Sequence, residues 1–328
     1  MQVSKVDEIV RYSRERIENG SKSFAAAARL FDADTRAHAY MLYAWCRHCD
    51  DVIDGQELGF AAGNTARGSA GDRLEELRQK TQAAVRGEWD EMVFGALHRV
   101  VSERGLPERY LLDHLDGFAM DVEGRHYETL DDTLSYCYHV AGVVGVMMAI
   151  IMGVRDGATL DRASDLGIAF QLTNITRDVM EDAAIGRVYL PGDWLAEAGI
   201  RPGAITDPAN RAAVHDVSQR LLAVSDRFYV SARHGIKSLS FRSAWAIASA
   251  RFVYRDIGRL VRSHGAAAWD QRARVSRGRK LYGIARSLAT IARSHAHGRL
   301  VAIPSRHGLW TRPHTGGGAL ESGFTLCG

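Results

Sequence analysis

Apolar residues recur every three or four positions along most of this chain, the spacing that places them on one face of an α-helix. The longest segments with this spacing contain no proline and span residues 27–54, 110–122, 134–152, 160–182 and 214–234. The alternation of apolar and polar positions that is typical of β-strands is scarce. The pattern therefore predicts an all-α protein, with a single domain in residues 1–300. Residues 301–328 are expected to form a C-terminal tail that is disordered in its last, glycine-rich part.

The composition is that of a soluble globular protein, with 46% hydrophobic and 25% charged residues in a chain of 328. The N-terminal stretch MQVSKVDEIV has no apolar centre of a secretory signal. The most apolar run, residues 140–154, is shorter than the roughly 20 residues of a membrane span, which favours a buried core helix. Four cysteines are too few for a disulfide framework, and Cys46 and Cys49 are interpreted as two small helix residues. We therefore expect a cytoplasmic protein.

Positive charge is concentrated near the C-terminus. The net charge is +3, but residues 259–312 hold twelve Arg and Lys against the single Asp270, a local net charge of +11. The rest of the chain carries −8. Such a segment can face anionic lipid, nucleic acid or a phosphorylated substrate, or it can be the solvated surface of C-terminal helices.

A first acidic cluster lies in CRHCDDVIDG, residues 46–55. On a helix Asp50 and Asp54 stand one turn apart, and Arg47 and Tyr43 extend the same face toward the N-terminus. Gly55 marks the helix end, so the carboxylates gather at the C-terminal turn, where the helix dipole disfavours anions. A cation should offset them. The alternative is a solvated acidic terminus that arginines neutralise.

A second cluster repeats this arrangement in residues 169–191. Asn174, Asp178 and Asp182 follow one another by one turn, and Gln171 and Arg177 share their stripe of the helix. Each cluster is followed by a loop candidate, residues 55–71 and 185–194. Two such faces could pair across a cavity whose mouth these loops cover.

The chemistry that these faces favour is metal-assisted. Carboxylates that face one another are costly without counter-charge, whereas a hard divalent cation reverses the balance. Mg²⁺ fits best, because it takes oxygen ligands and usually combines one or two carboxylates with substrate phosphates. Calcium fits less well, since the chain has no EF-hand loop. Acidic pairs, neighbouring arginines and an apolar interior together predict a hydrophobic substrate that carries a diphosphate.

Departure of that diphosphate would leave an allylic cation, which dry aromatic walls can stabilise. The predicted helices offer several aromatic rings for this purpose: Phe24, Tyr43, Tyr136, Phe170 and Tyr254. The alternative for each ring is simple core packing.

Four ordered stretches carry a resemblance to a known family. They are SKSFAAAARLF from Ser21, LYAWCRHCDDVID from Leu42, YCYHVAGVVGVMM from Tyr136 and LGIAFQLTNITRDVMEDAAIGRVYLP from Leu166. From about residue 9 to about residue 295 the chain resembles the squalene and phytoene synthase family, the head-to-head prenyltransferases. The resemblance implies an isoprenoid-synthase helical bundle around a central apolar cavity. It also implies the condensation of two geranylgeranyl diphosphates, through the cyclopropyl compound prephytoene diphosphate, to phytoene and two diphosphates.

The resemblance further implies roles for residues at matching motif positions. The metal-binding carboxylates would be Asp50, Asp54, Asp178 and Asp182. The catalytic residues would be Tyr136, Arg47 and Arg177. The substrate-binding residues would be Ser21, Lys22, Phe24, Tyr43, Gln171, Asn174, Arg187, Tyr254 and Arg272, with Arg274 as a close rival of Arg272. Two or more Mg²⁺ or Mn²⁺ ions would bridge the substrate diphosphates, and no nicotinamide is expected.

Two alternatives stay open. Squalene or dehydrosqualene synthesis from the shorter farnesyl diphosphate follows the same mechanism, and motif spacing cannot separate the two because chain length depends on cavity depth. A helical protein that binds nucleic acid through its basic segment would leave the two acidic faces unexplained, so no nucleic-acid partner is expected.

The expected product also predicts a location. A long hydrocarbon without polar groups leaves the cavity for lipid far more easily than for water, where each exposed CH₂ costs about 0.8 kcal/mol. We therefore expect peripheral association with the inner face of the cell membrane, through attraction of the basic segment to anionic lipid. Neighbouring enzymes of carotenoid synthesis are further expected partners.

Overall fold

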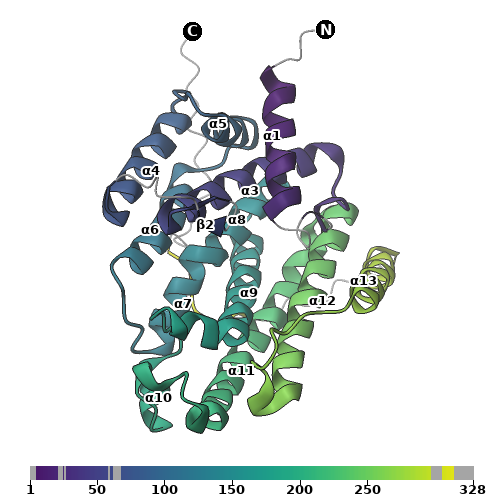
Figure 1. The fold of residues 1–328 in the computed structure, drawn as a ribbon. Helices are drawn as coiled ribbons and strands as arrows, with labels where there is room; N and C mark the ends of the chain where they lie inside the picture. The colour runs from purple at the N-terminus through teal and green to yellow at the C-terminus, as the bar shows by residue number, and fades with distance from the viewer. Residues whose placement is uncertain are drawn as a thin grey trace.

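A computed structural model describes residues 5–20, 25, 27–57, 60–61, 68–296 and 305–313. Within these residues the chain forms a bundle of α-helices, which confirms the all-α prediction (Figure 1). The only strands of the described part, β1 (Gln56–Glu57) and β2 (Phe60–Ala61), pair in antiparallel fashion. The α-helices are α1 (Lys5–Gly20), α3 (Ala33–Asp54), α4 (Ala70–Val85), α5 (Met92–Arg104), α6 (Glu108–Val122), α7 (Leu130–Cys137), α8 (Val143–Ile151), α9 (Gly157–Ala184), α10 (Gly192–Glu197), α11 (Arg211–Gly235), α12 (Phe241–His264) and α13 (Arg277–Ala296).

The longest helix, α9, occupies the centre of the bundle and packs along α11, α8 and α12 (Figure 1). It starts where the Asp156 side chain accepts a hydrogen bond from the Thr159 amide, an N-cap that satisfies one free backbone donor. Its middle is buried on several sides, through residues such as Ile168, Leu172 and Ile175. The helix predicted over residues 160–182 is therefore present and extends by two or three residues at each end.

Glycines let α8 and its preceding turn approach α9 closely. A Cβ atom on Gly167 would lie 2.1 Å from the Ala141 carbonyl oxygen, and one on Gly145 would lie 2.4 Å from that of Ala163. Both distances are far below van der Waals contact, so a side chain at either position would force the helices apart. A π-helical turn, η1 (Tyr138–Gly142), joins α7 to α8 just beside this contact.

The stretch from α7 to α8 is a core element. Leu130–Ile151 is long and apolar enough to cross a membrane by length and composition alone, because α7 continues into the apolar run. About two-thirds of its most apolar part, 67%, is nevertheless buried inside the fold. It packs against α6 and α9. This arrangement agrees with the expected buried core helix.

The start of α3 differs from the prediction. Apolar spacing predicted a helix from residue 27, but the chain breaks and α3 begins at Ala33. The Asp32 side chain accepts hydrogen bonds from the amide and the hydroxyl of Thr35, each at 2.8 Å. This N-cap competes with continuation of the preceding turn, a local effect that apolar periodicity does not register.

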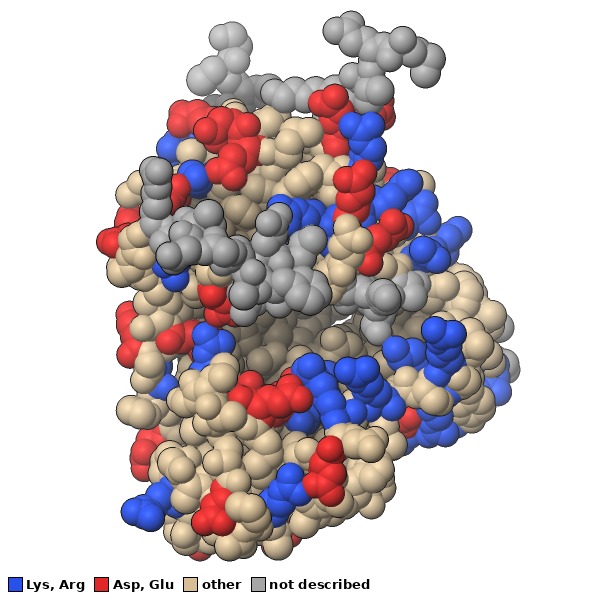
Figure 2. Space-filling model, in the orientation of Figure 1, with Lys and Arg blue, Asp and Glu red and all other residues tan. Residues whose placement is uncertain are grey.

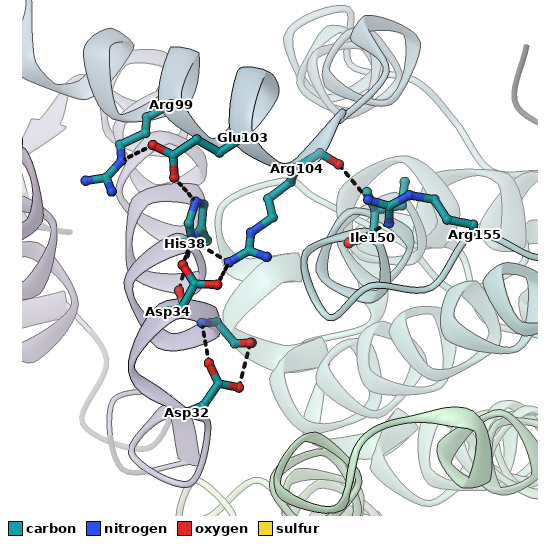
Figure 3. A network of polar contacts seen from close by, with 9 residues as sticks. Asp32, Asp34, His38, Arg99, Glu103, Arg104, Ile150 and Arg155 are labelled. Carbon is teal, nitrogen blue, oxygen red and sulfur yellow. Dashed lines mark hydrogen bonds and ion pairs between the residues drawn. The ribbon is translucent and has the colours of Figure 1, made fainter. Parts of the chain in front are cut away.

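A polar network anchors the first turns of α3 to the rest of the bundle (Figure 3). The buried His38 ring lies 2.8 Å from a Glu103 carboxylate oxygen on α5, and Arg104 pairs with Asp34. Arg155, in the loop before α9, donates to the Arg104 carbonyl at 2.9 Å. These contacts fix the direction in which α3 carries its acidic C-terminal end.

Residues 305–313, which the sequence assigns to the tail, pack on the body of the fold. Arg306 donates to both carboxylate oxygens of Asp165 on α9, at 2.9 and 2.7 Å. Arg312 donates to Asp161 at 2.6 Å, and the Trp310 ring lies 5.4 Å from that of Tyr138. The segment is thus part of the domain surface, and residues 314–328 lie outside the described residues.

Candidate active site

A central cavity of about 580 Å³ runs between α3, α6, α8, α9 and α12, and Figure 2 shows a hollow in the middle of one face of the molecule. Apolar side chains such as Val144, Met148 and Leu166 form much of its wall. The rings of Phe170 and Tyr254 stack in this wall with centroids 4.1 Å apart. Eight predicted site residues line the cavity: Tyr43, Arg47, Asp50, Tyr136, Gln171, Asn174, Arg187 and Tyr254.

The first acidic cluster occupies the last turns of α3. Arg47 forms an ion pair with Asp50 at 3.0 Å, and the Asp54 carboxylate accepts a hydrogen bond from Arg187 at 3.1 Å. Gly55 adopts a left-handed conformation with φ of 64°, and so ends the helix where the sequence predicted. Burial raises the pKa of Asp50 to about 6, against the opposing effect of Arg47 and with help from the Asp54 charge. Burial thus makes the ionised form of Asp50 costly even beside Arg47.

The second cluster lies on α9. Arg177 donates to Asp178 at 2.8 Å, and Arg272 binds both oxygens of the same carboxylate at 3.0 and 2.8 Å. Arg272, rather than its rival Arg274, is therefore the residue of the basic segment that contacts this cluster. Burial, followed by repulsion from Asp178, raises the pKa of Asp182 to about 7.

Arg187 connects the two clusters. It lies in the loop after α9, yet it contacts Asp54 at the end of α3. Its charge also opposes the raised pKa of Asp50 and of Asp182, so both carboxylates lie within its electrostatic reach. The two acidic helix ends therefore come together around Arg187 at the mouth of the cavity. Asp50 and Arg187 line the cavity, whereas Asp54, Asp178 and Asp182 are not among its lining residues.

Sequence reasoning missed two residues at this mouth, Asp121 and Tyr189. Asp121, near the end of α6, accepts hydrogen bonds from the hydroxyls of Tyr136 and Tyr189, at 3.2 and 3.0 Å. The rings of these tyrosines stack with centroids 4.5 Å apart. Burial raises the pKa of Asp121, and Arg187 opposes that shift. A single carboxylate late in a predicted helix gives no paired pattern, so no local signal marked it.

Three predicted substrate-binding residues, Ser21, Lys22 and Phe24, lie outside the described residues, and their roles stay predictions. The neighbouring Ala28 and Phe31 line the cavity.

Divalent cations fit the donors at this mouth. Among the described residues no group of three or more His, Cys, Asp or Glu side chains could hold an ion by itself. Mg²⁺ does not need such a cage, because phosphate oxygens and water usually complete its ligand shell. The Asn174 side-chain oxygen is buried without a hydrogen-bond partner. Burial, and then repulsion from neighbouring carboxylates, raises the pKa of Asp50 and of Asp182, and a bound cation would oppose both effects. Asp50, Asp54, Asp178, Asp182 and Asn174 thus offer oxygen ligands of the kind that Mg²⁺ takes, and arginines pair with the first three of these carboxylates.

The CxxC cysteines have no features of a reactive pair. Cys46 and Cys49 are free thiols, and Cys49 is fully buried in α3. Burial, with added repulsion from Asp50, raises the pKa of Cys46 to about 12. A thiol that keeps its proton at neutral pH is a poor nucleophile and metal ligand.

The chain is similar to known proteins in both its sequence and its structure. The squalene/phytoene synthase family profile matches residues 17–279. A 15-cis-phytoene synthase of Enterobacter agglomerans is 52% identical over 299 residues, which cover 90% of this chain and 100% of that protein. A phytoene synthase of Pseudescherichia vulneris is 49% identical over 306 residues, 93% of this chain and 98% of that protein. The solved structure of a dehydrosqualene synthase matches with a TM-score of 0.77 and 26% identity, covering 88% of this chain and 98% of that one.

Proposed function

The chain belongs to the squalene/phytoene synthase family, and on that premise we infer that it is a transferase that condenses two prenyl diphosphates to phytoene. We propose geranylgeranyl diphosphate as the substrate, with prephytoene diphosphate as the intermediate and two diphosphates as leaving groups. The observation that carries this proposal is the meeting of two arginine-flanked acidic helix ends at the mouth of one apolar cavity.

The geometry suits ionisation of a diphosphate at the mouth and protection of a cation inside. Arg47, Arg177, Arg187 and Arg272 already lie beside the acidic residues and can donate bidentate hydrogen bonds to diphosphate oxygens. The apolar wall excludes water from the hydrocarbon chains and from the cation that departure creates. Stacked Phe170 and Tyr254 offer ring faces to positive charge inside this wall.

Enzymes of this kind depend on metal, and we propose Mg²⁺ or Mn²⁺ held by Asp50, Asp54, Asp178 and Asp182, with Asn174 beside the second pair. When bound, these ions would neutralise the departing diphosphate and so stabilise it as a leaving group.

Product analysis tests the proposed function. The protein with geranylgeranyl diphosphate and Mg²⁺ or Mn²⁺, and without reductant, should release phytoene, as read by chromatography and mass spectrometry. A chelator should abolish the reaction and added Mg²⁺ restore it, because the carboxylates and the substrate are all anionic. Farnesyl diphosphate in a parallel reaction tests the shorter-chain alternative. Preferential formation of dehydrosqualene would show that farnesyl diphosphate, rather than geranylgeranyl diphosphate, is the substrate. Turnover without metal would refute the metal assignment.

The Tyr136 hydroxyl gives a second test. It donates to Asp121 and its ring stacks on Tyr189, so the phenol stands at the junction between the charged mouth and the apolar cavity. Tyr136→Phe keeps the ring and removes only the donor that can orient toward diphosphate or cation. We expect slower phytoene formation and accumulation of the cyclopropyl intermediate, measured in single-turnover reactions. Rates equal to those of the parent protein would mean that Tyr136 serves only in packing.

We further propose that the protein attaches peripherally to the inner face of the cell membrane, where a hydrocarbon product can enter lipid. Not every basic residue of the segment 259–312 is available to lipid, because at least six of those that the structure describes pair with carboxylates of the fold. They are Arg259, Arg262, Arg272, Arg279, Arg306 and Arg312. Attraction to anionic lipid must therefore come from the remaining basic residues.

A further inference from the structure

Helix α13 is a basic, amphipathic helix at the edge of the bundle, where it packs on α12 (Figure 1). Its sequence RGRKLYGIARSLATIARSHA contains five Arg and Lys and no acidic residue. One face is buried against α12. There a Cβ atom on Gly283 would lie 2.2 Å from the Phe252 ring, and Ser287 and Ile291 are 6% and 5% exposed. The opposite face is open to solvent.

The outer face of α13, defined here as Arg277, Leu281, Tyr282 and Arg286, exposes large apolar groups. Among the described residues five large hydrophobic side chains are exposed, and two of them are the adjacent Leu281, at 68%, and Tyr282, at 50%. Tyr282 rests edge-on against Phe252, with ring centroids 5.9 Å apart, while Arg286 donates to its hydroxyl at 3.1 Å. A tyrosine with one side on apolar groups and its hydroxyl among polar ones is typical of a membrane interface.

The charge of this face is not neutralised within the described part of the fold. Arg279, on the side of α12, binds both oxygens of Asp256 at 2.7 and 2.9 Å. Arg277 and Arg286, by contrast, form no ion pair with any described carboxylate. Figure 2 shows Lys and Arg gathered on the side of the molecule where α13 lies and also beside the central hollow. Exposed cations thus flank exposed apolar side chains on one helix.

We propose that the outer face of α13 is the surface that contacts the membrane. The helix lies in the plane of an anionic leaflet, with Leu281 and Tyr282 at the boundary between headgroups and acyl chains and Arg277 and Arg286 against lipid phosphates. A nucleic acid would use the arginines but would leave the apolar pair in water, so lipid is the favoured partner. This proposal deepens the peripheral attachment proposed above and names its surface.

Flotation with vesicles tests the proposal on the full chain. Vesicles of phosphatidylglycerol mixed with phosphatidylcholine should bind the protein at low salt, and vesicles of phosphatidylcholine alone should bind it much less. Leu281→Asp and Arg286→Glu should each weaken binding about tenfold, because each brings negative charge to the leaflet. The matched control is Val230→Asp, which changes another exposed apolar residue, 52% exposed, on α11. Equal binding by Leu281→Asp, Val230→Asp and the parent protein would overturn the proposal.

A fluorescent label distinguishes insertion from simple attraction. In a background without Cys327, an environment-sensitive dye on Leu281→Cys should shift to shorter wavelength with anionic vesicles, and the same dye on Val230→Cys should not. Binding without any shift at position 281, or equal displacement by duplex DNA of matched charge, would refute contact of this face with lipid.

Activity is the independent readout. With substrate dispersed in detergent, turnover of Leu281→Asp and Arg286→Glu should match that of the parent, because neither residue lines the cavity. Absence of phytoene with every variant, including the parent, would refute the proposed function and leave the flotation result intact.

Discussion

Asp50→Asn and Asp178→Asn should each lower phytoene formation by about 100-fold or more while the protein stays folded. Each substitution keeps an oxygen in place and removes one negative charge from the proposed metal ligands. Charge stabilisation by a bound metal amounts to several kcal/mol, and each 1.36 kcal/mol corresponds to about tenfold in rate. Steady-state rates with geranylgeranyl diphosphate at saturating Mg²⁺ measure the effect.

The matched control is Asp216→Asn, which changes a carboxylate that is 85% exposed on α11. It should leave both rate and stability unchanged. Full activity in Asp50→Asn and in Asp178→Asn would remove these carboxylates from the metal assignment.

The same substitution at Asp50 should stabilise the metal-free protein at high pH. The pKa of Asp50 is about 6 in the folded chain against 3.8 as its ordinary value, mainly because the group is buried. The folded protein therefore favours the protonated carboxyl group. Its contribution to the free energy of unfolding is fully present below about pH 4 and is lost as pH rises through about 6. Asp50→Asn has no such loss. Its melting temperature in the presence of chelator should exceed that of the parent at pH 8 and approach it at pH 4.5.

Local patterns predicted the helices and both acidic clusters, because spacing of three or four residues is enough to place side chains on one helix face. Asp50 with Asp54, and Asp178 with Asp182, are such pairs. The family resemblance predicts that Arg187 lies near the diphosphates. In the structure Arg187 contacts Asp54, which is 133 residues away in the sequence, and so connects the two acidic clusters.

Features that depend on distant pairing could not be predicted in this way. Asp121 belongs to the site because the packing of α6 places it on the cavity wall, where Tyr136 and Tyr189 from other elements donate to it. The basic segment is strongly charged along the sequence, yet at least six of its described basic residues pair with carboxylates of the fold. Arg272, for example, contacts Asp178, and Arg306 contacts Asp165. Charge counted along a segment therefore overstates the charge that the folded surface presents.

Arg306→Met should destabilise the protein by about 3–5 kcal/mol, the typical cost of breaking a buried ion pair from one side. The Asp165 side chain has no exposed surface, and Arg306 holds both of its oxygens. Burial already raises the pKa of Asp165 despite this partner. At about 2–4 °C per kcal/mol, the melting temperature should fall by roughly 10 °C. The matched control is Arg201→Met, because Arg201 is exposed.

A second substitution separates loss of the ion pair from loss of packing. Asp165→Asn in the Arg306→Met background removes the unpaired charge, so the double variant should be more stable than Arg306→Met alone. The loss of stability of Arg306→Met relative to the parent protein should also grow from pH 5 to pH 8. The reason is that a buried carboxylate with a raised pKa loses its stabilising protonated form as pH rises. Equal melting temperatures of Arg306→Met and Arg201→Met at both pH values would contradict this prediction. Residues 305–313 would then lie against α9 without stabilising the fold, as expected of a C-terminal tail.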